Sequence, residues 1–253
     1  MNFAEKKNIN FYEKLYKDGQ NHQYPNLDLV RIHHTHLKKN LGKLLDYGSG
    51  SGENSKFLAL NGHKVYSLDS SKSACKIIKK KNLELKKNQK IEVINIKNFK
   101  KLPFGNNFFE NIICLSVLSL VGGKSNIKNL ISEFTRILIP GGFMLLDING
   151  KKGDFAKDKT KKITCIKSKN SFLNLVTKKS LKFIFIGDAS QLPPVNEDIS
   201  PALNKQYIEQ TYGHKVEDFA LTEIKRQDLN SGIIKYRNTH HEKDLSQLIS
   251  NTI

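Results

Sequence analysis

Three glycines at alternate positions, Gly48, Gly50 and Gly52, follow a short apolar stretch. Glycine lets the backbone approach a ligand closely, and a helix that begins just after it offers unpaired amide donors at its N-terminus. Asp69 ends the next apolar stretch, where a carboxylate can accept hydrogen bonds from both hydroxyls of a ribose. A glycine loop of this kind serves dinucleotides and adenosyl cofactors alike, so the spacing indicates binding of a nucleotide-like cofactor.

Polar residues near these two points extend the candidate site. Asp46 heads the glycine loop, where its carboxylate could order the loop amides or accept a hydrogen bond from an ammonium group. Asn98 and Phe99 follow residues 91–96, which alternate apolar and polar residues as a strand does, and an amide oxygen there could accept from the amino group of an adenine. The candidate cofactor-binding residues are therefore Asp46, Gly48, Ser49, Gly50, Gly52, Asp69, Ser70, Asn98, Phe99 and Leu115.

The elements that must position these residues alternate along the chain. Apolar stretches typical of buried strands are separated by segments with helical periodicity, and Pro140-Gly141-Gly142 is expected to turn the chain into the last strand. Strands that alternate with helices in this way predict an α/β fold with a doubly wound parallel sheet covered on both faces. The predicted strands are residues 43–47, 64–68, 91–96, 111–116 and 143–148, and the predicted helices are residues 25–39, 53–61, 72–86 and 127–138.

At these motifs the chain resembles class I S-adenosylmethionine-dependent methyltransferases. The glycine motif of that family is matched by residues 46–52 and its acidic strand end by Asp69. Its Leu-Pro-Phe stretch with a following Phe-acid pair is matched by residues 102–104 and 109–110, and its Pro-Gly-Gly turn by residues 140–142. The resemblance covers about residues 10–150. It departs from the family at Asn98, where Asp is usual, and at the last two strands of the family's sheet, which are not recognisable here.

The resemblance implies a methyltransferase domain over residues 1–150 with a Rossmann-like fold. It implies S-adenosyl-L-methionine as the cofactor and catalysis mainly by proximity and orientation, with no assigned catalytic residue. Residues 1–40 would then form a lid, with Tyr12, Tyr16 and Tyr24 as candidates for its wall. Two alternatives stay open: a nucleotide-binding domain of another kind, such as a dehydrogenase, and a domain in which these residues are only structural.

A second signature lies further along the chain. Residues 187–194 resemble the γ-phosphate-sensing motif of superfamily 1 DNA helicases, and residues 221–227 resemble the next helicase motif, which implies a sensing role for Gln191 and a charge-stabilising role for Arg226. The chain has no GxxxxGK[ST] loop to hold phosphates. The sequence therefore predicts a small α/β helicase-like or AAA-type fragment over residues 171–253, joined by a lysine-rich junction at 151–170 and unable to hydrolyse ATP. An ATPase fragment and a non-catalytic fusion remnant are the alternative functions.

The net charge of +18 raises nucleic acid as a partner. The excess is almost entirely lysine, whereas bidentate recognition of phosphates and base edges favours arginine, and an AT-rich coding sequence gives the same composition. A small-molecule acceptor is therefore preferred. Nucleic acid binding through the lysine-rich and helicase-like C-terminal part is the alternative. The arginines are Arg31, Arg136, Arg226 and Arg237.

The remaining features favour a cytoplasmic protein without a metal. Cys75, Cys114 and Cys165 are odd in number and widely spaced, which suits a reducing compartment and argues against a disulfide framework. No apolar stretch follows the first residues as in a signal peptide, and the longest apolar run, residues 112–121, is too short to span a bilayer. His33, His34 and His36 lie on one predicted helix, and His33 and His36 share a face of it. No third ligand stands at metal spacing from these two, so no metal site is predicted.

Overall fold

The computed structural model describes residues 2–96, 101–150 and 159–165. These residues all belong to one compact unit of the chain. The helicase-like motifs, with Gln191 and Arg226, lie outside the described residues. So do Asn98 and Phe99 of the candidate cofactor site, and residues 151–158 and 166–170 of the lysine-rich junction.

A parallel sheet of five strands forms the centre of the described residues, as the sequence predicts. Its order is β3-β2-β1-β4-β5, so successive strands are added to one side of β1 and then to the other. The chain therefore reverses its direction of travel between β1 and β4, at the kind of crevice where open α/β sheets bind ligands. The strands are β1 (Lys43–Tyr47), β2 (Lys64–Asp69), β3 (Glu92–Asn95), β4 (Phe109–Cys114) and β5 (Leu138–Leu146).

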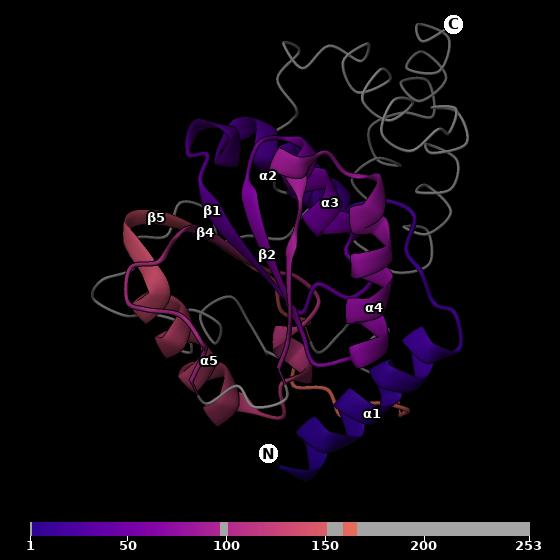
Figure 1. Ribbon diagram of the computed structural model, residues 1–253. Coiled ribbons are helices and arrows are strands. Elements are labelled where there is room, and N and C mark those ends of the chain that lie inside the picture. The colour runs from indigo at the N-terminus through magenta and orange to yellow at the C-terminus, as the bar shows by residue number, and fades with distance from the viewer. Residues whose placement is uncertain (1, 97–100, 151–158, 166–253) are drawn as a thin grey trace, which may run out of the picture. The chain divides into compact units, whose positions relative to one another are not determined.

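Helices cover both faces of this sheet. Figure 1 shows α4 and α5 on opposite sides of the strands, with α1 beside α4. The described residues thus form the three layers of a doubly wound fold. The α-helices are α1 (Phe3–Lys17), α2 (Leu27–Thr35), α3 (Glu53–Leu60), α4 (Lys72–Lys81) and α5 (Lys124–Ile137), and single 3₁₀ turns occupy Leu37–Lys39, Asn82–Glu84, Lys87–Gln89 and Leu118–Leu120.

The main hydrophobic core lies between α5 and the strands β1 and β4. Tyr47 and Phe134 pack edge to face there, with ring centroids 5.1 Å apart, and neither Phe134 nor Ile112 is exposed at all. Burial of such side chains is the main favourable term in folding, and truncation of a buried Phe typically costs about 3–5 kcal/mol. This core fixes the C-terminal ends of β1 and β4, which carry the glycine loop and Leu115.

Two predicted boundaries were wrong for identifiable reasons. The helix expected over residues 72–86 ends at Lys81, because the side chain of Asn82 pairs with the backbone of Ile91, its Nδ2 donating to the Ile91 carbonyl at 2.7 Å and its Oδ1 accepting from the Ile91 amide at 2.9 Å. Residues 140–142 do not precede β5 but lie inside it. Leu138 pairs with Phe109 and Phe143 pairs with Asn111, so the Pro-Gly-Gly segment is a bulge in the strand.

The N-terminal helix α1 was not predicted from the sequence. It begins with a capping box, in which the side chain of Asn2 accepts from the Glu5 amide at 2.9 Å and that of Glu5 accepts from the Asn2 amide at 3.2 Å. Residues 163–166 resemble a strand in sequence, but the three of them that the structure describes, residues 163–165, are not in a strand. No helix in the described part of the chain is long and apolar enough to cross a membrane.

Candidate functional site

The glycine loop is held against the end of β2 by its own backbone. The amides of Gly48 and Ser49 both donate to the carbonyl of Leu68, at 2.7 and 3.3 Å. Gly48 has a φ of 73°, and a Cβ at this position would stand 2.3 Å from Cγ2 of Val117. The loop then leads into α3, whose N-cap is Gly52. A side chain at Gly48 would therefore separate the loop from the end of β4.

Asp69 joins the end of β2 to the glycine loop. Its Oδ2 accepts a hydrogen bond from the Gly50 amide at 2.8 Å, and its Oδ1 accepts from the Ser71 amide at 2.8 Å. The side chain is only 8% exposed, and burial raises the pKa of Asp69 to about 6 even though these backbone amides favour the charged form. Each carboxylate oxygen keeps a second lone pair for an incoming hydroxyl. Ser70 lies between Asp69 and Ser71 in the sequence and is half-buried.

Asp46 lies at the end of β1 and is nearly fully buried. Its Oδ2 accepts from the hydroxyl of Ser55 at 2.6 Å, and the Ser55 hydroxyl in turn contacts that of Ser67 on β2. Burial raises the pKa of Asp46 to about 7, and the neighbouring Asp69 adds to the effect. These contacts fasten the start of α3 to β1 and β2. The structure thus gives Asp46 a part in positioning the loop.

Leu115 and the residues after it bring a further carboxylate to the site. The amide of Ser116, a residue with a φ of 60°, donates to Oδ1 of Asp147 at 2.6 Å. Asp147 follows directly after β5, and burial raises its pKa to about 6. The adjacent Val117 touches Gly48, so Asp147 lies near the same end of the sheet as Asp46 and Asp69.

Asp147 was missed in the sequence, where it falls within a predicted strand. The signal that could have identified it is the one that identified Asp69. Both are acidic residues at the C-terminal end of an apolar strand, where open α/β sheets place their ligand-binding groups.

The N-terminal helix α1 lies over the glycine loop. A Cβ at Gly50 would stand 2.4 Å from the hydroxyl oxygen of Tyr16, and burial, together with the nearby Asp69, raises the pKa of that hydroxyl. One turn earlier, the carboxylate of Glu13 accepts from the hydroxyls of Ser71 and Ser73 at 2.7 and 2.8 Å. Of the predicted lid residues, Tyr16 is therefore placed directly on the loop. Glu13 was not predicted, and Tyr12 and Tyr24 are half-buried.

No metal centre is formed by the described residues. The ring of His33 packs edge to face against His63 and Phe57, with centroids 5.4 and 5.2 Å apart, and burial lowers the pKa of His33 to about 3. Within residues 2–96, 101–150 and 159–165, no group of three or more His, Cys, Asp or Glu side chains could hold a metal ion. Cys114 is buried, and burial raises the pKa of its thiol, so it does not have the character of a nucleophile.

The described site therefore combines a bare glycine loop, the N-terminus of α3 and three carboxylates at one end of a parallel sheet. The loop brings backbone amides to the N-terminus of α3, Asp69 offers acceptors for hydroxyl groups, and Tyr16 lies against Gly50. This donor and acceptor set fits an adenosyl cofactor with a free ribose. The described residues contain no group of three or more His, Cys, Asp or Glu side chains that could hold a metal ion.

Part of the chain is similar to known methyltransferases. Residues 45–146 match the methyltransferase domain family. A SAM-dependent methyltransferase from Leishmania major has a similar structure at 10% sequence identity, with a TM-score of 0.57 over 76% of this chain and 78% of that one. No curated protein has a significantly similar sequence.

Two other solved structures are more weakly similar. A SAM-dependent methyltransferase from Methanosarcina mazei is 21% identical, with a TM-score of 0.49 over 57% of this chain and 81% of that one. The CcbJ methyltransferase from Streptomyces caelestis is 17% identical, with a TM-score of 0.48 over 59% of this chain and 60% of that one. The family match and the order of the strands together indicate a methyltransferase-like fold for residues 45–146.

Proposed function

We propose that this chain is a S-adenosyl-L-methionine-dependent methyltransferase that acts on a small-molecule acceptor. The observation that carries the proposal is the joining of Asp69 to the glycine loop through the Gly50 amide, at 2.8 Å. This contact places an acceptor for ribose hydroxyls beside backbone that a ligand can approach closely. The methyltransferase family match over residues 45–146 supports the same reading.

In this proposal each part of the site has a separate task. Gly48, Ser49, Gly50 and Gly52 form the loop that binds the cofactor at the N-terminus of α3, and Asp69, with Ser70 beside it, binds the ribose. The cofactor, when bound, supplies a methyl group on a sulfonium, which is already a good leaving group. The chain then has only to hold a nucleophile in line and exclude water, which accounts for a site without a catalytic triad.

The acceptor would lie at the C-terminal ends of β4 and β5, near Leu115 and Asp147. The Ser116 amide occupies one position on Oδ1 of Asp147, and the second oxygen can hold an acceptor hydroxyl or ammonium. Binding of nucleic acid through the lysine-rich residues is the alternative. It would be independent of sequence and would fall steeply with salt.

The proposal extends to the compartment. None of Cys75, Cys114 and Cys165 is in a disulfide, and the first two are buried. Free thiols persist in a reducing cytoplasm, where we place the protein. Microscopy of a fluorescently tagged chain in its own cells tests this, and accumulation outside the cytoplasm would contradict it.

Calorimetric titration with S-adenosylhomocysteine tests the cofactor assignment. Asp69→Ala should weaken binding by at least tenfold, since a hydrogen bond to a charged group contributes about 1.5–3 kcal/mol. Asp18→Ala, at an exposed aspartate just after α1, is the matched control and should bind like the wild type. Equal affinity of the Asp69 and Asp18 variants, both shown to be folded by circular dichroism, would overturn the assignment.

A further inference from the structure

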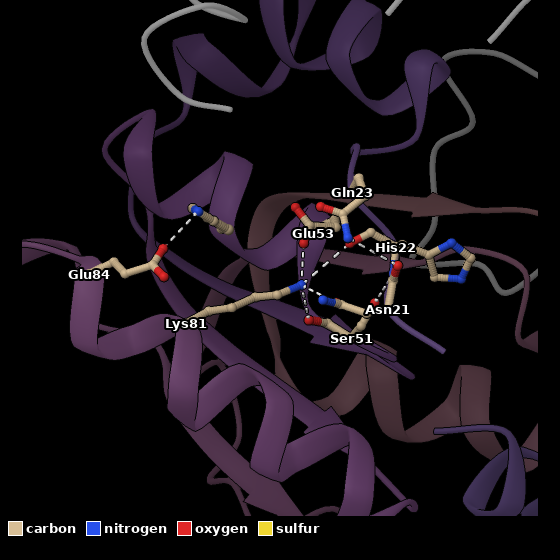
Figure 2. A network of polar contacts seen from close by, with 8 residues as sticks. Asn21, His22, Gln23, Ser51, Glu53, Lys81 and Glu84 are labelled. Carbon is tan, nitrogen blue, oxygen red and sulfur yellow. Dashed lines mark hydrogen bonds and ion pairs between the residues drawn. The ribbon is translucent and has the colours of Figure 1, made fainter. Parts of the chain in front are cut away.

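Lys81 is the last residue of α4 and differs from the other lysines of that helix in its surroundings. Lys79 and Lys80 are exposed, whereas the side chain of Lys81 is only 14% exposed. Figure 2 shows its ammonium group turned toward several acceptors. It forms an ion pair with Glu53, the first residue of α3, and donates to the carbonyl of Ser51 in the glycine loop at 2.9 Å.

The same ammonium group also reaches the segment that connects α1 to α2. We call residues 18–26 the connector. Lys81 donates to Oδ1 of Asn21 at 2.7 Å and to the carbonyl of His22 at 3.4 Å. One side chain therefore contacts both the connector and the start of the cofactor loop. Because an ammonium group has three N–H donors, these acceptors account for its whole hydrogen-bonding capacity.

Two direct hydrogen bonds hold the connector at the same place. The amide of His22 donates to the hydroxyl of Ser51 at 2.9 Å, and the amide of Asn26 donates to Oδ1 of Asn54 at 2.8 Å. Ser51 thus binds Lys81 through its carbonyl and the connector through its hydroxyl. The connector therefore lies alongside the end of the glycine loop and the first turn of α3.

The charge arrangement makes Lys81 the residue on which this contact depends. Glu53 is only 8% exposed and has its carboxylate in the first turn of α3, where the helix dipole favours it. Loss of the ammonium group would leave this buried carboxylate, the Asn21 side chain and two carbonyls without their common donor. Such groups are costly to leave unpaired, and they regain partners most easily when water enters as the connector moves away.

We infer that Lys81 is a positioning residue that holds the connector on the glycine loop and thereby limits how fast the cofactor enters and leaves. The inference rests on the proposed function for its cofactor part. The connector is continuous with α1, whose Tyr16 covers Gly50, so release of the connector frees one end of the cover over the loop. The other end stays attached through Glu13 to Ser71 and Ser73.

Hydrogen exchange and ligand kinetics on three variants of the full chain test this role. Lys81→Met keeps the aliphatic stem and removes the charge, Lys81→Arg keeps the charge, and Lys80→Met is the matched control on the exposed side of the helix. In the ligand-free protein, Lys81→Met should speed amide exchange in residues 20–26 at least tenfold and leave β1 and β4 unchanged. It should also speed dissociation of S-adenosylhomocysteine at least threefold. Lys81→Arg should restore part of both, and Lys80→Met should match the wild type.

The outcomes separate the two parts of the inference. Equal exchange of residues 20–26 in the Lys81→Met and Lys80→Met variants would overturn the positioning role, and so would faster exchange spread evenly over β1 and β4. Faster exchange with an unchanged rate of dissociation would overturn control of the cofactor. If the wild type binds no S-adenosylhomocysteine, the proposed function fails and the cofactor part fails with it, while the exchange data still decide whether Lys81 holds the connector.

Discussion

The hydroxyl of Tyr16 lies so close to Gly50 that a Cβ on this glycine would stand 2.4 Å from it. Gly50 also has a φ of 53°, a backbone conformation that other residues rarely adopt. The N-terminal helix and the glycine loop are thus fitted to each other at one residue. That contact joins α1, a helix that was not predicted from the sequence, to the glycine motif, which was.

Gly50→Ala should therefore lower the melting temperature and weaken binding of S-adenosylhomocysteine. A strained φ alone costs on the order of 1–3 kcal/mol, and the contact with Tyr16 adds to it. Gly105→Ala is the matched control, because nothing lies within 4 Å of a Cβ at that position and its φ is not positive. Addition of Tyr16→Phe should recover part of the lost stability, which a double-mutant cycle measures. Equal behaviour of the Gly50 and Gly105 variants would contradict the packing described here.

Asp46→Asn should change how stability depends on pH. Burial raises the pKa of Asp46 from 3.8 to about 7, so between these values the folded chain binds a proton that the unfolded chain has released. Wild-type stability due to this group is therefore full below pH 4 and falls as pH rises to 7, by on the order of a few kcal/mol. The difference in melting temperature between Asp46→Asn and wild type should shift in favour of the variant from pH 5 to pH 8. A difference in melting temperature that stays constant over this range would contradict the raised pKa of Asp46.

His33→Leu should act in the opposite direction. Burial lowers the pKa of His33 from 6.5 to about 3, and its ring nitrogens have no hydrogen-bond partner among the described residues. As pH falls from 6.5 toward 3, the unfolded chain gains a proton that the folded chain resists, so stability is lost. The variant should lose less stability than the wild type between pH 7 and pH 4.5 in urea unfolding. Parallel loss in the two proteins would show that His33 does not contribute to acid sensitivity.

The strands were predicted well because their signal is local. β1 has the predicted bounds, and the other four strands overlap their predictions. β1, β2 and β4 are mostly buried, and buried parallel strands are nearly continuous apolar runs in the sequence. β3 lies at an edge of the sheet, and its signal is an alternation of apolar and polar residues. The glycine motif and Asp69 could also be located, because the positions of loop and strand end follow from the alternation of elements. Their mutual hydrogen bond through the Gly50 amide confirms that the two motifs meet.

The features that were missed depend on contacts between distant residues. The end of α4 is set by the pairing of Asn82 with Ile91, and the Pro-Gly-Gly bulge is set by the register of β5 on β4. Neither has a local signal. Likewise Lys81 is one of many lysines in the sequence, and only the folded chain shows that its ammonium group is buried against Glu53.

An assay of ATP hydrolysis tests the prediction that the helicase-like segment is not an active ATPase. The sequence lacks a GxxxxGK[ST] loop, so the full chain should show no steady-state ATP hydrolysis with or without DNA. A coupled assay for ADP release measures this. Turnover that disappears on Arg226→Ala would overturn the prediction and assign an ATPase function to the C-terminal part.

The central claim, that the glycine loop and Asp69 bind an adenosyl cofactor, is tested most directly by thermal unfolding of the full chain with S-adenosylhomocysteine and, separately, with ATP. A ligand at about 100 times its Kd stabilises the folded state by about 2.7 kcal/mol, which corresponds to roughly 5–10 °C for a domain of this size. We expect a shift of this order with S-adenosylhomocysteine, a shift reduced to about half or less in Asp69→Ala, and no shift with ATP. Stabilisation by ATP with none by S-adenosylhomocysteine would contradict the claim.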